Sequence, residues 1–219
     1  MPLVLVESEA YQPLPAGPLF DRWVLEQPVG LAVGLVLTGA VIGHLLRIRG
    51  MLKQGLLVLG LCTFLSGGVL AAGWLVTTTR ERVTTESARF VEVFAAADAA
   101  GVGRMLDERV IFSSGGESLR GRGREWAMGV AAGMRGQISD VAVKPLGAVE
   151  DGPDAARTRI WVRAAVADAG IVPSTWELSW RRTGGRDAAW KIVKIDCLRL
   201  YGEPVRGESS AWVRWADER

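Results

Sequence analysis

Histidine and cysteine are nearly absent from this 219-residue sequence, which has one histidine and two cysteines. His44 lies in a hydrophobic run, so the rest of the chain has no histidine for a zinc site or a Ser-His-Asp triad. Cys62 lies in a second hydrophobic run and Cys197 in an expected strand, an arrangement that indicates neither a disulfide nor a metal-binding spacing. We therefore expect neither a metal ion nor another cofactor.

An excess of charge of one sign is also missing. The formal net charge is +2, and no segment is dense in Lys or Arg. This pattern argues against nucleic acid as a partner. Arg far outnumbers Lys, and Ala and Gly are abundant, which is typical of a GC-rich coding sequence and leads us to expect a bacterial protein.

Two long segments contain almost no ionisable group. Residues Pro28–Leu46 carry only His44, and residues Gly55–Val76 carry none. Each segment is long enough, as a helix, to cross a hydrocarbon core of ~30 Å. The sequence thus predicts a multi-pass integral membrane protein with the lipid bilayer as a partner. Small residues at four-residue intervals are expected to pack the two helices together; they are Gly30/Gly34, Gly39/Gly43 and Gly68/Ala72.

The short connection between the two segments is basic, with Arg47, Arg49 and Lys53 and no acidic residue. Short loops rich in Lys and Arg stay on the cytoplasmic side. This rule places the N-terminal segment (1–27) and the C-terminal domain outside the cytoplasm. His44 is expected near the interface, within reach of lipid headgroups.

The remaining sequence predicts helices followed by strands. After a juxtamembrane linker (77–83), a helix is expected with Thr84 or Thr85 as its N-cap, then a short helix capped by Asp98. A strand at 110–112, a turn and a helix at 122–134 follow. Strands are expected at 138–149, 155–166, 174–182 and 189–200, joined by Gly- and Asp-rich turns as an antiparallel meander. The tail, 202–219, is compatible with a short helix or with disorder.

Two stretches of this domain resemble a known superfamily. They are ADAAGVGRMLDERVIF with the following RGRGREWAMGV helix, and the closing strands STWELSWRRTGGRDAAWKIVKIDCL. Both look like the nuclear transport factor 2-like (SnoaL-like) superfamily, over about residues 84–201. The resemblance implies an α+β fold: a cone of helices packed on a curved antiparallel sheet, with a pocket at the open end. We expect this domain to follow the transmembrane hairpin.

Alternation along the strands separates two faces. The face toward the helices should be apolar and would form a core or border a cavity; its candidate pocket residues are Phe90, Phe94, Trp126, Val130, Met134, Trp176 and Trp180. The opposite face should carry Arg159, Trp161, Arg163, Glu177 and Arg181. It is either a solvated face with cross-strand ion pairs or a surface for a homodimer or membrane-complex partner. In the last strand, Val193, Ile195 and Cys197 are expected to face the helices.

Enzymes of this superfamily place carboxylates inside the cone, and this sequence offers only Asp196, which would face inward only if the last strand were flipped. We therefore expect a membrane-anchored, non-catalytic binding or scaffold module. The alternatives are a binder of a small apolar ligand or lipid and a SnoaL-like isomerase, cyclase or hydrolase. An enzyme predicts a buried, unpaired carboxylate in the pocket, a binder predicts an apolar cavity, and a scaffold predicts a filled cone and an exposed Trp161.

Overall fold

The structure, a computed structural model, describes residues 14, 28–75, 78–167, 169–184, 188–207 and 211–217. The expected N-terminal segment, 1–27, lies outside these residues apart from Leu14. The chain divides into two compact units, Ala16–Thr78 and Thr79–Arg219, the latter together with Met1–Pro15.

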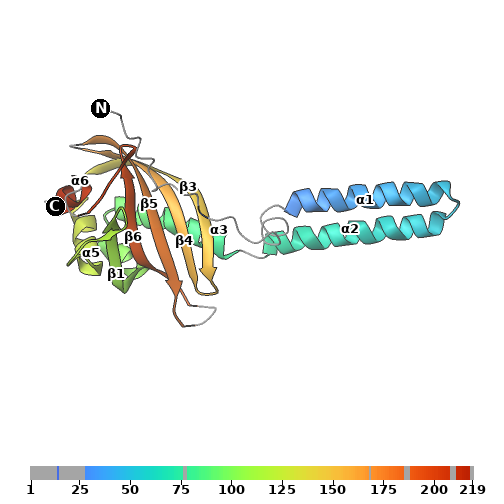
Figure 1. The fold of residues 1–219 in the computed structure, drawn as a ribbon, viewed down its shortest axis with the longest axis horizontal. Helices are drawn as coiled ribbons and strands as arrows, with labels where there is room; N and C mark the ends of the chain where they lie inside the picture. Colours follow the sequence, from blue (N-terminus) through green and yellow to red (C-terminus); the bar gives the residue numbers. More distant parts are fainter. Residues whose placement is uncertain are drawn as a thin grey trace, which may run out of the picture. The chain divides into compact units, whose positions relative to one another are not determined.

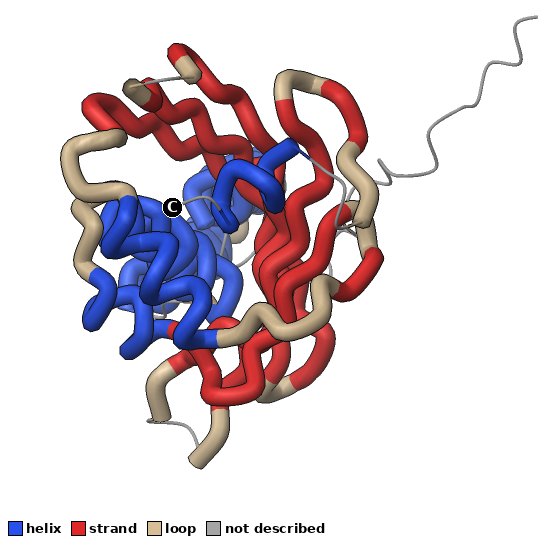
Figure 2. Tube along the Cα trace, turned by 90° about the vertical axis from the view of Figure 1, so that its left-hand side faces the viewer, coloured by secondary structure: helices blue, strands red, loops and turns tan. Residues whose placement is uncertain are grey.

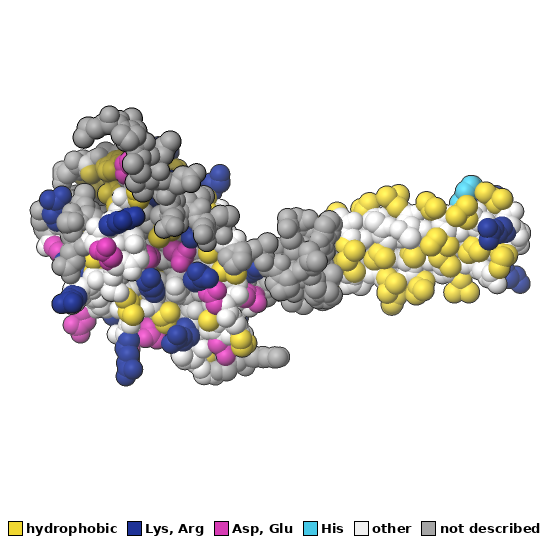
Figure 3. All heavy atoms as spheres, viewed as in Figure 1, with side chains coloured by type: hydrophobic (Ala, Val, Ile, Leu, Met, Phe, Trp, Pro, Cys, Tyr) yellow, Lys and Arg dark blue, Asp and Glu magenta, His cyan; other side chains and the backbone are white. Residues whose placement is uncertain are grey.

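The first unit is a helical hairpin of α1 (Pro28–Ile48) and α2 (Leu52–Leu75), which run side by side (Figure 1). Both helices are long and apolar enough to cross a membrane. Large apolar side chains are exposed around the hairpin (Figure 3), among them Val33, Leu37, Leu57 and Phe64. Both helices extend beyond the predicted segments toward the loop between them: α1 continues to Ile48 and α2 starts at Leu52 rather than at residue 55. The loop is therefore short.

The two helices touch through small residues near the loop end and the middle. A Cβ atom added at Gly39 would lie 2.6 Å from the Cβ of Cys62, and one added at Gly55 would lie 2.8 Å from the carbonyl oxygen of Gly43. Ser66 Oγ also donates a hydrogen bond across the hairpin, to the carbonyl oxygen of Ala32 at 3.0 Å. Glycine is needed where backbones approach this closely.

The predicted small-residue pairs contribute unequally to this packing. The pair Gly39/Gly43 lies at the helix contact. By contrast, a Cβ added at Gly30, Gly34 or Gly68 would meet nothing within 4 Å. The expectation that these three glycines pack the hairpin is therefore wrong, because spacing alone does not determine which face of a helix meets its neighbour.

We expect Gly55→Val to destabilise the hairpin by about 1–3 kcal/mol, because the added atoms meet backbone that cannot move aside. Gly60→Val is the matched control, since Gly60 lies in the same helix with open space around it. Denaturation of the full chain in mild detergent, followed by circular dichroism, measures both. Equal stability of the two variants would contradict the close contact.

The second unit is an α+β domain with one sheet (Figure 1). Its elements are α3 (Thr79–Ala95), α4 (Ala99–Met105), β1 (Leu106–Ser114), β2 (Glu117–Ser118), α5 (Arg124–Gly133), β3 (Ile138–Gly152), β4 (Ala155–Val166), β5 (Gly170–Arg182), β6 (Trp190–Leu200), β7 (Glu203–Pro204) and α6 (Ala211–Asp217). The strand order is β2-β1-β6-β5-β4-β3, with β7 beside β6. The sheet curves around the helices (Figure 2).

The predicted meander of β3 to β6 is confirmed, and β4 has the predicted bounds. The expected antiparallel sheet has one parallel pair, because β1 pairs in parallel with β6, with Phe112 opposite Ile195. This pairing joins segments far apart in the sequence, and local alternation carries no information about it. The sheet is therefore mixed.

The start and the end of the domain differ from the sequence expectations, whereas one expected helix cap is confirmed. Helix α3 begins at Thr79, so Thr84 and Thr85 lie within it and neither is its N-cap; the domain begins before residue 84. Asp98 does cap α4, since its Oδ1 accepts from the Gly101 amide at 2.8 Å. Residues after 201 belong to the domain rather than to a separate tail, because β7 pairs with β6 and α6 buries Val213 in the core.

Strand β6 departs from simple alternation at two places. The pairing with β5 shifts so that neither Val193 nor Leu198 has a partner. Each shift reverses the side-chain alternation, as a β-bulge does. As a result Ile192 on one side of the irregularity and Ile195 on the other both enter the core, while Val193 is only half-buried, contrary to expectation.

Candidate ligand cavity

The domain has a partly open cavity of about 370 Å³ between its helices and the curved sheet. Ligand pockets in proteins have volumes of roughly 300–1,000 Å³. The wall is apolar and comes mainly from α3, α5, β4 and β5. It includes six of the seven residues named from the sequence: Phe90, Phe94, Trp126, Val130, Met134 and Trp176. Their part in binding stays a prediction.

The seventh, Trp180, is fully buried but does not line the cavity. It lies in a polar contact beneath α3 that sequence reasoning missed. The indole Nε1 of Trp180 donates to Thr158 Oγ1 at 3.0 Å, and Thr158 Oγ1 lies 2.7 Å from Ser87 Oγ. Ser87 in turn donates to the carbonyl oxygen of Val83 at 2.6 Å. This chain of hydrogen bonds ties the sheet to α3 and satisfies each buried polar group in it.

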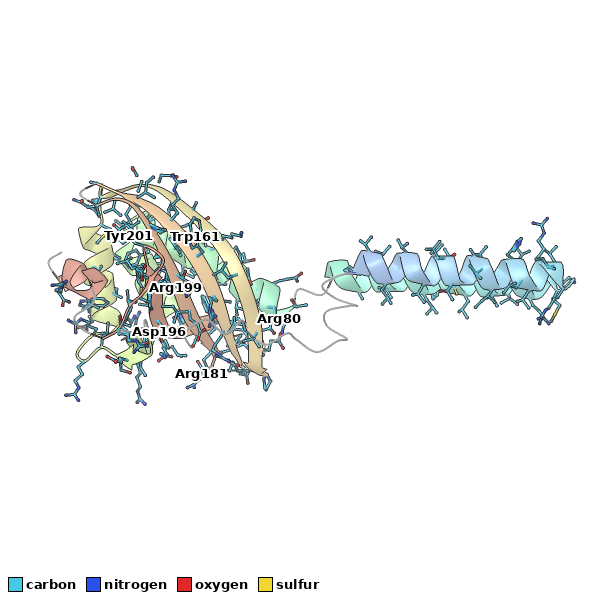
Figure 4. All side chains as sticks on the ribbon, turned by 45° about the horizontal axis from the view of Figure 1, so that its top comes forward. Arg80, Trp161, Arg181, Asp196, Arg199 and Tyr201 are labelled. Carbon is cyan, nitrogen blue, oxygen red and sulfur yellow. The ribbon has the colours of Figure 1, made fainter. Side chains whose placement is uncertain are left out.

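No Asp, Glu, Lys, Arg or His side chain lines the cavity among the residues that the structure describes. The polar atoms of the wall are largely engaged. Ser174 Oγ donates to the carbonyl oxygen of Val162 at 3.3 Å and accepts from Trp176 Nε1 at 2.8 Å. Tyr201, at the end of β6, also lines the cavity, although it is 54% exposed, and it brings a phenol hydroxyl to the wall (Figure 4). A wall of this kind suits an apolar molecule.

Asp196, the one internal carboxylate considered from the sequence, is not at the cavity. It is buried, accepts from the Gly116 amide at 3.2 Å and forms an ion pair with Lys194 at 3.2 Å. Its neighbour Cys197 is also buried, and burial followed by the nearby Asp196 charge raises the pKa of the thiol well above its ordinary range. Neither group is placed to serve as a base or a nucleophile for a molecule in the cavity.

The opposite face of the sheet carries the predicted polar set. Arg159 lies opposite Glu177 in the β4–β5 register and forms an ion pair with it at 2.7 Å. Arg157 adds contacts to Glu177 at 3.7 Å and to Asp151 at 2.6 Å. The hydrogen bond to Asp151 is the main reason why the pKa of Arg157 is raised.

The other members of that set lie on β4 and β5. Trp161, which pairs with Lys144 and Thr175, is half-buried, whereas Arg163 and Arg181 are exposed. Figure 4 shows Trp161 and Arg181 on the sheet. The use of this face for a dimer or partner remains a prediction.

Helix α6 lies between the helices and the sheet at one end of the cavity (Figure 2), and its Ala216 contributes to the wall. Its last residue, Asp217, accepts from Arg122 Nη2 at 2.5 Å and Nε at 3.3 Å, and from Trp126 Nε1 at 3.2 Å. These bonds, chiefly that from Arg122, hold the pKa of Asp217 below its ordinary value of 3.8. The ring of Trp126 packs edge-on against Phe112, with centroids 4.9 Å apart.

Because its folded-state pKa is lowered, the Asp217 carboxylate stabilises the fold above its unfolded pKa, and this contribution disappears as the pH falls through the folded value. We expect the Tm of the wild type to be slightly higher than that of Asp217→Asn at neutral pH. The difference in Tm should stay constant down to about pH 5 and disappear below about pH 4. Thermal unfolding across this range measures it. A difference that disappears near pH 6 would show that Asp217 is not the titrating group.

No family model and no curated protein matches the chain. Among solved structures, the chain is similar to a ketosteroid isomerase-like protein from Erwinia carotovora (14% identity, 52% of this chain and 90% of that chain, TM-score 0.41). It is also similar to a nuclear transport factor 2-like protein from Rhodospirillum rubrum (17%, 52% and 95%, 0.42) and to the association domain of C. elegans CaMKII (16%, 53% and 92%, 0.44).

These likenesses concern fold and carry nothing about activity. The domain's own helices and strands supply the architecture: α3, α4 and α5 cover the inner face of a curved mixed sheet whose last four long strands form a meander. By that order and packing, Thr79–Asp217 has the arrangement that the sequence led us to expect, helices packed on a curved sheet, and it is preceded in the chain by a pair of helices apolar enough to span a membrane.

Proposed function

We propose that this protein is a non-catalytic binding module that holds a small apolar ligand or lipid in its cone and is anchored to a membrane by the α1–α2 hairpin. The observation that carries the proposal is the cavity of about 370 Å³, whose described wall has no charged side chain. An apolar molecule that fills such a space is removed from water, and each Å² of apolar surface buried in this way contributes about 25 cal/mol to the free energy of binding. A filled cone would have favoured a scaffold, and a buried unpaired carboxylate an enzyme.

A titration of the full chain in lipid nanodiscs with the neutral, apolar fluorophore N-phenylnaphthylamine tests this function. We expect saturable enhancement of its fluorescence above that of empty nanodiscs, and competition by dodecanol. Enhancement equal to that of empty nanodiscs at every concentration would refute the proposal, since it would mean that the probe sees only lipid.

We further propose that the hairpin crosses the bilayer with its loop in the cytoplasm, so that the C-terminal domain lies on the other side. The support is the pair of apolar helices and the basic loop bearing Arg47, Arg49 and Lys53. Alkaline phosphatase fused to the C-terminus should then be active in a bacterial host, and green fluorescent protein at the same position should be dark. The opposite pair of results would reverse the topology.

A further inference from the structure

Three donors converge on one carboxylate at the edge of the cavity. Arg122 presents both Nε and Nη2 to Asp217, and Trp126 presents Nε1 to the same Oδ1 atom that Arg122 Nε contacts. A guanidinium that offers two parallel N–H groups matches the geometry of a carboxylate or phosphate. The three donors, which come from α5 and the loop before it, therefore form an anion site that α6 of the same chain occupies.

This anion site is continuous with the apolar cavity. Trp126, Phe112 and Ala216 all line the cavity, and Trp126 is also one of the three donors. The Arg122 side chain is only 16% exposed, whereas that of Asp217 is 41% exposed. A molecule whose tail lay in the cavity could thus bring a negatively charged end group to Arg122 and Trp126 without burying it.

The occupant, α6, is a short helix. It has seven residues, and a helix of this length has little stability of its own. Among its described side chains, Val213 and Ala216 enter the core and Asp217 makes the ion pair. A partly exposed ion pair contributes only about 0–1 kcal/mol, so another anion can compete with it.

We propose that the ligand is a single-chain amphiphile with an anionic head, a carboxylate or a phosphate, whose head takes the place of the Asp217 carboxylate on Arg122 and Trp126. The inference rests on the proposed function, because the tail is the apolar ligand of the cavity. Asp217 then acts as an internal competitor: it fills the anion site in the empty protein and leaves it, with the end of α6, when the ligand binds.

The test compares three probes with the same alkyl chain: dodecanoate, dodecyl phosphate and dodecanol. Each competes with N-phenylnaphthylamine on the full chain in nanodiscs, with empty nanodiscs as the partition control. Asp217→Asn should raise the affinity for the anionic probes about threefold to tenfold and leave that for dodecanol unchanged. Adding Arg122→Gln to Asp217→Asn should abolish the gain. The larger gain identifies the head, carboxylate or phosphate.

The matched control is Glu125→Gln, which removes one negative charge from an exposed position of α5 without touching the anion site. An equal gain in this variant would attribute the effect to general electrostatics and overturn the inference. So would affinities for both dodecanoate and dodecyl phosphate that stay unchanged relative to dodecanol in Asp217→Asn, while binding of dodecanol itself would leave the proposed function standing. Failure of all three probes in every variant would refute the proposed function, and this inference with it.

Discussion

Replacing Trp180 with alanine is expected to lower the free energy of unfolding of the C-terminal unit by about 3–5 kcal/mol. The side chain is 1% exposed, so its removal leaves a cavity in the packed part of the core, away from the ligand cavity. The change also removes the hydrogen bond that Trp180 Nε1 donates to Thr158 Oγ1 at 3.0 Å. The free energy of unfolding of a protein is typically about 5–15 kcal/mol, so this single substitution would remove a large part of it.

Urea denaturation of the full chain, followed by circular dichroism of the sheet, measures this loss. Trp180→Phe is an intermediate change, because it keeps a six-membered ring in the core and removes the N–H donor with the rest of the indole; we expect it to lose about 1–3 kcal/mol. Trp161→Ala serves as the control on the opposite, half-buried face. If Trp180→Ala were no more destabilising than Trp161→Ala, the buried position of Trp180 would be wrong.

Filling the cavity from the sheet is expected to weaken ligand binding at least tenfold. Val162 lines the cavity from β4, and Val162→Trp places an indole in the space that the ligand would occupy. Because the space of about 370 Å³ is already present, the new ring need not displace its neighbours as it would in a close-packed core. We therefore expect a large loss of affinity with little loss of stability.

Competition between dodecanol and N-phenylnaphthylamine measures the affinity of this variant, and its Tm measures stability. Arg163→Trp is the control, since it adds the same ring at the next residue of β4, where the side chain is exposed on the other face. Unchanged binding in Val162→Trp, with the domain folded, would place the ligand elsewhere.

The sequence was a reliable guide where local pattern determines structure. Alternation along β4 predicted both of its ends, and the spacing of Phe90, Phe94 and Trp126 predicted residues that now border one cavity. Asp98 was recognisable as a cap because the cap contacts an amide only three residues away. The hairpin segments were evident from composition alone, and helices form there in the structure.

Features that depend on distant parts of the chain could not be predicted in this way. The parallel pairing of β1 with β6 sets Phe112 opposite Ile195, and the local sequence of neither strand predicts it. Alternation sets Trp180 on the same strand face as Trp176 and so predicts both in the pocket, but Trp180 bonds to Thr158 where the sheet meets Ser87 of α3, and only Trp176 reaches the cavity. Asp217 acquires its role from Arg122, which lies 95 positions earlier.

The two irregularities of β6 have a consequence for how this strand can vary. On either side of Val193 the inward positions follow opposite phases, so that Ile192 and Ile195 share a face although an uninterrupted strand would set them on opposite faces. Deleting Val193 would restore regular alternation and leave Ile192 and Ile195 two positions apart, so that both would still face the core. Val193 is thus an extra residue that resets the alternation of β6, and its loss would cost the strand its local bend rather than its apolar face.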